Sequence, residues 1–274
     1  MTIAVVAGLA FLLLGSGGSQ LGGPVAEAAT LSSNTPGYRI HMALEMTSSA
    51  LSSPITATGS GVVDLRDHSA SMSLAMDLGA QPQVIQQLGS STLRMDMITE
   101  GGAVYLRLPA AVTAALPTSG RQWVKVDLAK LSSIPGLSSL AGNPTTSDPT
   151  SVLRSLRSVS DGVVDEGSQR IGRVRTEHYH SDLNVSALTG SLPTAARSVL
   201  SQALPSGGIP VDVWIDSSHL VRRVVMTLDV GVPTGPSVHE TMTVDLGHYG
   251  LQQSPAAPPA DQVTDLTSLA NAAG

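Results

Sequence analysis

Alternating apolar and polar residues predict a chain built mostly of β-strands. In residues 68–78, HSASMSLAMDL, the side chains of Met72, Leu74 and Met76 share one face, and the other face carries mainly Ser and Ala. This period-2 pattern is typical of a half-buried strand. It recurs, at least in part, in Tyr38–Met46, Gly59–Leu65, His68–Leu78, Thr92–Thr99, Ala103–Leu108, Arg121–Leu128, Val174–Leu183, Ile209–Asp216, Leu220–Val230 and Val238–Leu246. Local turns such as Glu100-Gly101-Gly102 favour an antiparallel meander.

Two further segments show a helical pattern. In residues 148–160, Asp148 can cap a helix and Pro149 suits its first position. Residues 191–204 repeat this design, and each segment has one apolar stripe that needs an apolar surface to cover. The stripes include Leu153 and Leu156 in the first helix and Val199 and Leu200 in the second.

The methionines lie on the strands. Of the nine methionines, the eight after Met1 all fall in predicted strands, on the more apolar face of each. They are either adaptable fillers of a sheet core or the lining of a site for flexible alkyl chains, since thioether side chains repack at little cost. Two short helices and a single Phe offer little bulk to cover about ten strands, so we expect an underfilled inner face. The predicted lining of this cavity is Met42, Leu44, Met46, Met72, Leu74, Met76, Leu93, Met95, Met97, Leu153, Leu156, Val199, Leu200, Met226 and Met242.

Composition excludes several kinds of chemistry. The 274 residues are 42% hydrophobic and 13% charged, with a net charge of −6 that is not gathered in blocks. This distribution, with 3% aromatic residues, argues against a nucleic-acid partner. The absence of cysteine from the sequence excludes disulfides, thiolate metal sites and a cysteine nucleophile. We expect no cofactor.

The N-terminal residues resemble an export signal. Residues 3–14 are apolar throughout, too short for the ~20 residues that span a bilayer but suited to the core of a signal peptide. Ala26-Glu27-Ala28 fits a cleavage site, although a basic residue before the apolar run is missing. We therefore expect residues 1–29 to be an export signal or membrane anchor, residues 30–252 the folded domain, and residues 253–274 a flexible extension. The alternative for the apolar run is a buried N-terminal helix.

Four stretches, in order along the chain, resemble the LppX/LprA/LprF/LprG group of mycobacterial and actinobacterial lipoproteins. They are QWVKVDL (122–128), RVRTEHYHSDL (173–183), PVDVWIDSSHLVRRVVMTLD (210–229) and PPADQVTDL (258–266). The resemblance implies a mainly β (α+β) fold similar to LolA and LppX, a U-shaped antiparallel half-barrel with helices packed on its concave face. It also implies a cavity for acyl chains of lipids or glycolipids, carriage between the membrane and the cell wall, and a membrane lipid exporter as partner.

Two departures from that group bear on the interpretation. Leu13-Leu14-Gly15-Ser16 is similar to a lipobox, but serine stands where the lipidated cysteine would be. The protein is therefore expected at the cell membrane, in the periplasmic space or in the cell wall, or else released from the cell. At His219 the group usually has glycine, so we expect a left-handed backbone there, which His tolerates at some cost.

Two other functions compete with a lipid carrier that is not an enzyme. His178, His180 and Asp182 share one strand face and would offer a metal two imidazoles and a carboxylate, but solvated histidines are the more frequent reading of such a face. A serine hydrolase is disfavoured because no G-x-S-x-G motif occurs. The second competitor is an envelope scaffold with a filled core, in which Trp123 and Trp214 anchor a protein partner.

Overall fold

The computed structural model describes residues 23–79, 81, 85–86, 89–107, 109, 120–127, 153, 156, 162–183, 208–230 and 236–265. These residues form one twelve-stranded sheet with an α-helix at its N-terminal end. The elements are α2 (Pro24–Ser33), β1 (Gly37–Ser48), β2 (Ile55–Asp64), β3 (Ser69–Asp77), β4 (Thr92–Glu100), β5 (Ala103–Arg107), β6 (Trp123–Asp127), β7 (Val164–Ile171), β8 (Val174–Leu183), β9 (Ile209–Asp216), β10 (Val221–Val230), β11 (Val238–Gly247), the 3-10 turn η3 (Ala260–Gln262) and β12 (Val263–Asp265).

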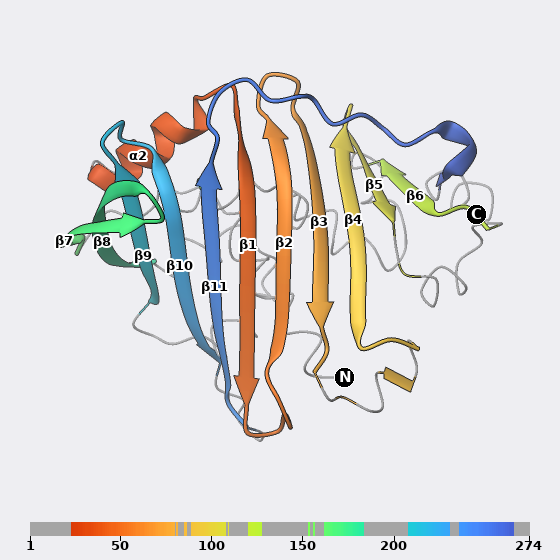
Figure 1. Ribbon diagram of the computed structural model, residues 1–274, viewed down its shortest axis with the longest axis horizontal. Coiled ribbons are helices and arrows are strands. Elements are labelled where there is room, and N and C mark those ends of the chain that lie inside the picture. Colours follow the sequence, from red (N-terminus) through yellow and green to blue (C-terminus); the bar gives the residue numbers. More distant parts are fainter. Residues whose placement is uncertain are drawn as a thin grey trace, which may run out of the picture.

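The sheet has two arms that meet at β1. Its strand order is β12-β6-β5-β4-β3-β2-β1-β11-β10-β9-β8-β7, and every neighbouring pair is antiparallel except β12 and β6. One arm runs from β1 to β6 as a simple meander, and the other returns from β7 to β11, which pairs with β1 (Figure 1). The whole sheet is open and curled (Figure 1). This arrangement confirms the predicted mainly β, antiparallel fold class.

The predicted strands agree closely with the observed ones. Ile209–Asp216 and Val174–Leu183 have the predicted bounds, and the other eight differ by at most four residues at an end. The predicted helices lie largely outside the described residues, but Leu153 and Leu156 have helical backbone and are buried in the core. The left-handed conformation expected at His219 is present, with φ of 57°.

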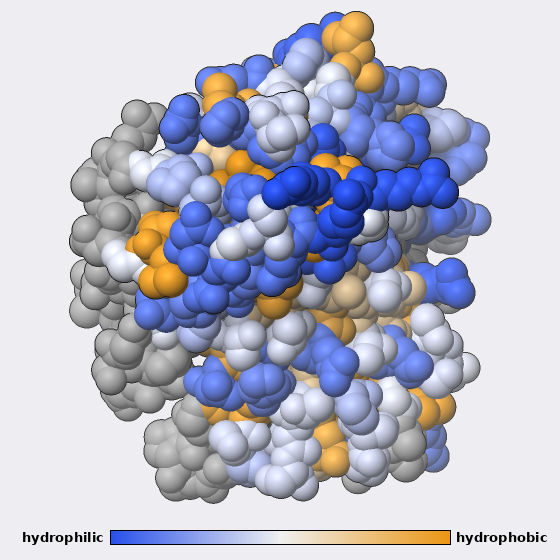
Figure 2. All heavy atoms as spheres, turned by 60° about the vertical axis from the view of Figure 1, so that its left-hand side comes forward, coloured by the Kyte–Doolittle hydropathy of each residue, from blue (hydrophilic) through white to orange (hydrophobic). Residues whose placement is uncertain are grey.

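Strand β7 was not predicted. Its sequence, VDEGSQRI, has no apolar alternation, and most of its side chains are exposed because it is an edge strand. Figure 2 turns this edge toward the reader and shows mostly hydrophilic side chains around it. Charged and polar residues on an edge strand discourage pairing with another chain.

The helix α2 spans the predicted domain boundary at residue 29. Val25, Ala28 and Ala29 are buried in the core, and α2 packs against β9 and β10. The Ser32 hydroxyl accepts a hydrogen bond of 2.9 Å from the backbone N–H of Val221. The predicted cleavage site and the boundary at residue 29 lie within this helix, and the division of the chain stays a prediction. No helix of the described residues is long and apolar enough to span a membrane.

The segment after β11 contacts the sheet at several points, within the range 253–274 that is predicted to be an extension. The Ser254 hydroxyl donates to the buried carboxylate of Asp64 at 2.8 Å, and this contact is the main reason that the pKa of Asp64 lies below its ordinary value. The backbone N–H of Ala257 donates to Glu100 at 2.6 Å. The chain then crosses to the far edge of the sheet, where β12 pairs with β6 (Figure 1). Residues 266–274 lie outside the described part.

Candidate functional site

All eleven strand residues of the predicted lining lie on one face of the sheet. The registers place Met42 opposite Gly59 and Val244, and Leu74 opposite Gly59 and Met95. We call this face, which carries the predicted strand lining Met42, Leu44, Met46, Met72, Leu74, Met76, Leu93, Met95, Met97, Met226 and Met242, the methionine face. Leu153 and Leu156, from the first predicted helix, join its buried cluster. Val199 and Leu200 lie outside the described residues.

The methionine face divides into two halves of different exposure. On β1, β10 and β11 the predicted lining residues are buried, none of them more than 8% exposed. On β3 and β4, five of them remain half-buried, whereas Met72 is buried. We call these regions the covered half (Met42, Leu44, Met46, Met226 and Met242) and the open half (Leu74, Met76, Leu93, Met95 and Met97). The open half is an apolar surface of five neighbouring side chains that the fold does not bury completely.

Small residues of β2 separate the two halves. Ala57, Gly59 and Gly61 occupy the β2 positions of the methionine face. They lie between the larger side chains of β1 and β3. A Cβ atom at Gly61 would lie 2.3 Å from the carbonyl oxygen of Ser71, so β2 and β3 approach each other too closely for a side chain there. A Cβ atom at Gly59 would lie 3.3 Å from Cδ1 of Leu74, which shows that the Leu74 side chain leans over β2. Gly59 thus leaves room for the Leu74 side chain, and Gly61 for the close approach of β2 and β3.

One polar residue of the methionine face was missed. Glu240 on β11 lies opposite Met46 of β1 and Leu228 of β10, and it is 1% exposed. Neither of its carboxyl oxygens has a hydrogen-bond partner in the described part of the chain. Burial alone raises the pKa of Glu240 to about 7. The sequence held a signal for this residue, since it is the single acidic residue on the apolar side of the strand from 238 to 246.

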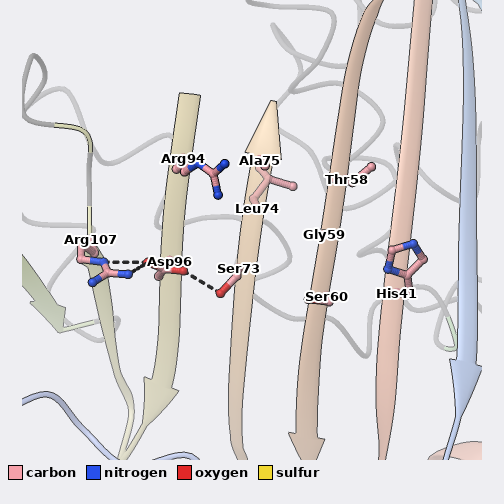
Figure 3. A pocket seen from close by; sticks show the side chains of 10 residues that line it. All are labelled: His41, Thr58, Gly59, Ser60, Ser73, Leu74, Ala75, Arg94, Asp96 and Arg107. Atoms are coloured by element: carbon pink, nitrogen blue, oxygen red, sulfur yellow. Dashed lines mark hydrogen bonds and ion pairs between the residues drawn. The ribbon is translucent and has the colours of Figure 1, made fainter. Parts of the chain in front are cut away.

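The opposite face of the sheet is polar. It carries an open depression of about 580 Å³, in which the Asp96 carboxylate accepts hydrogen bonds from Arg107 and, at 2.6 Å, from Ser73 (Figure 3). The lining consists of His41, Thr58, Gly59, Ser60, Ser73, Leu74, Ala75, Arg94, Asp96 and Arg107. This depression is open, and seven of its ten lining residues have polar or charged side chains.

The histidines considered as metal ligands form a hydrogen-bonded cluster instead. His178 and His180 contact the same oxygen of Asp212, at 2.8 and 3.0 Å, and not Asp182. His178 also stacks on Trp214, with ring centroids 4.3 Å apart. Within the described residues, no group of three or more His, Asp or Glu side chains is arranged to hold a metal ion. The alternative of a metal held by His178, His180 and Asp182, which the sequence disfavours, thus has no arranged ligand set in the described residues.

The two tryptophans lie on the polar face, where their strand position places them. Trp214 donates its indole N–H to Gln169 at 2.9 Å, and the Arg107 guanidinium lies 5.5 Å from the ring centre of Trp123. Both rings are partly buried by these neighbours. Their role as anchors for a protein partner stays a prediction.

The fold is similar to the solved structures of two mycobacterial proteins. LprF from Mycobacterium bovis is 11% identical, with 90% of this chain and 100% of that chain covered and a TM-score of 0.46. The Mycobacterium tuberculosis lipoprotein LppX is 14% identical, with 84% and 95% covered and a TM-score of 0.45. LprF and LppX are two of the proteins that the four sequence stretches resemble. No protein-family model matches the chain, and no curated protein matches it with significance.

Proposed function

We propose that this protein is a lipid-binding envelope protein without catalytic activity, and that the open half of the methionine face holds hydrocarbon chains of lipids or glycolipids. The observation that carries the proposal is that Leu74, Met76, Leu93, Met95 and Met97 share one surface and stay half-buried in the folded chain. Contiguous apolar patches are uncommon on the surface of a soluble monomer and mark interaction sites.

The chemistry of this surface fits a flexible chain. Each buried CH₂ group contributes about 0.8 kcal/mol, so one long acyl tail would gain on the order of 10 kcal/mol if it were fully removed from water. Binding of this kind needs few polar contacts. Methionine side chains adapt to irregular shapes, so selectivity would be loose and set mainly by the available volume.

Transport follows from the same energetics. A membrane offers the tail an equally apolar environment, so transfer of the tail to the acceptor membrane costs little free energy. We propose that the protein is exported, collects the lipid at a membrane surface and carries it toward the cell wall or outer envelope. An exporter in the membrane is the proposed donor.

The test measures the lipid bound to the purified wild-type protein and to one matched pair of variants. The full chain is purified from an actinobacterium, and organic extracts are analysed by mass spectrometry. Leu74→Trp adds bulk on the methionine face, and Ala75→Trp places the same indole side chain on the polar face of the same strand. Thermal unfolding checks that both variants fold.

Stoichiometric lipid in the wild type and in Ala75→Trp, together with its loss from folded Leu74→Trp, supports the proposal. Clean extracts from folded wild-type protein contradict it and favour the envelope scaffold. Equal loading of both variants shows that the open half does not hold the chain.

A further inference from the structure

The most unusual group on the methionine face is the Glu240 carboxyl. Its cross-strand neighbours are Met46 and Leu228, and its neighbours two residues away on the same strand are Val238 and Met242. All four are buried and apolar. The adjacent residue His239 points to the other face, where its ring contacts Asp229 at 2.7 Å. The described neighbours on β1, β10 and β11 therefore offer Glu240 no positive charge and no hydrogen-bond donor.

A buried carboxyl without a partner lowers the stability of the folded chain. A buried carboxylate without a partner is strongly disfavoured, which is why burial raises its pKa to about 7 and favours the protonated form. The protonated carboxyl still has one O–H donor and a carbonyl acceptor. Nearly all buried polar groups in proteins are paired, so two unpartnered oxygens in an apolar surface require an explanation.

The position of Glu240 relative to the open half suggests that a bound ligand is the hydrogen-bond partner of its carboxyl. Glu240 lies on β11, and the open half begins on β3, three strands away in the sheet order. Neighbouring strands are about 4.8 Å apart, so the separation across the sheet is about 14 Å. A long acyl chain is longer than this distance. Because Glu240 is 1% exposed, a chain on the open half contacts its carboxyl only when the side chains that cover Glu240 move aside.

We propose that Glu240 is the polar recognition group of the lipid site and that it selects chains bearing a hydroxyl group. This inference rests on the proposed function and names the class of ligand. A hydroxyl both donates and accepts, so it matches a protonated carboxyl, whereas a plain hydrocarbon leaves both carboxyl oxygens unpaired. Sites built around a buried polar group discriminate against ligands that leave this group without a partner.

The experiment compares two neutral probes on delipidated full-length protein. Methyl hydroxystearate and methyl stearate differ only in the hydroxyl on the chain. We expect wild-type protein to bind the hydroxylated probe about tenfold more tightly, which is the size expected for one buried hydrogen bond. The measurement is a fluorescence displacement titration.

Three variants locate the effect. Glu240→Leu is expected to lose the preference and to bind methyl stearate at least as tightly as the wild type does. Glu240→Gln keeps a donor and an acceptor, so a reduced preference should remain. Glu45→Leu is the matched control, because Glu45 lies exposed on the polar face of the neighbouring strand β1, and it should bind both probes as the wild type does.

The outcomes separate this inference from the proposed function. Tight binding of both probes with no preference, unchanged in Glu240→Leu, overturns the role of Glu240 and leaves the lipid site standing. Binding of neither probe by folded wild-type protein overturns both.

Discussion

The covered and open halves of the methionine face have similar residues but different surroundings. Met46 in the covered half has no exposed surface, whereas Met95 in the open half, of the same residue type and on the same face, is half-buried. Residue type alone therefore does not decide which part of a sheet face is core. The covered half has the properties of a stabilising core, and the open half has those of a surface for a ligand.

The largest expected difference between the halves is in stability. Met46→Ala should lower the free energy of unfolding by about 2–5 kcal/mol, as is usual when a buried methionine is truncated. Met95→Ala should cost about 1 kcal/mol or less, because its side chain is already partly in water. Urea denaturation of delipidated protein measures both. If both substitutions lowered the free energy of unfolding by the same amount, the open half would be packed core.

A second prediction concerns the pH dependence of the protein's stability, to which the buried Glu240 beside the covered half contributes. Its pKa is raised from 4.5 to about 7 in the folded protein, so the folded state binds the proton more tightly than the unfolded state does. Stability from this group is therefore fully present below about pH 4.5 and falls as the pH rises to about 7, by roughly 3 kcal/mol in total. Glu240→Leu should remove this part of the profile.

Glu45→Leu is the control for this profile, because Glu45 is exposed on the polar face. Urea denaturation between pH 4 and pH 8 provides the measurement. A wild-type profile that matches that of Glu240→Leu at every pH would mean that Glu240 is not buried as a lone carboxyl.

The smallest expected effect tests why methionine is used in the open half. Replacing Met76, Met95 and Met97 together by Leu should change stability little, since Leu and Met exchange for less than about 1.5 kcal/mol each. The stiffer side chains should narrow the range of chain lengths that the protein carries, as measured by mass spectrometry of extracts. The same replacement of Met42, Met46 and Met242 should leave that range unchanged. An unchanged range of chain lengths in the variant of Met76, Met95 and Met97 would show that the flexibility of the thioether side chains is not used.

Much of the sheet could be predicted from the sequence because its strands alternate. Where one face is buried, as in Val238–Gly247, period-2 patterning marks both the strand and the inward side of each residue. All eleven strand residues predicted as lining share one face for this reason. The exposed edge strand β7 and the short β12 lack such a pattern, because neither buries one regular face.

Other features depend on tertiary contacts that no local pattern reports. Pro24 suits the first position of α2, but the packing of this helix on the sheet depends on its contacts with β9 and β10. Attachment of Ser254 to Asp64 joins residues far apart in sequence. The division into a covered and an open half could not be predicted either, because Met46 and Met95 have the same local pattern. Glu240 could have been found, since an acidic residue on the apolar side of a strand is visible in the sequence.

The methionine methyl groups provide the most direct test of the central claim. Methionine labelled with ¹³C at the methyl group gives a separate NMR signal for each residue, and methyl stearate can be titrated into delipidated protein. We predict large shifts for Met76, Met95 and Met97 and small ones for Met46 and Met242. Shifts confined to Met46 and Met242, or no shifts while the protein remains folded, would contradict a hydrocarbon site on the open half.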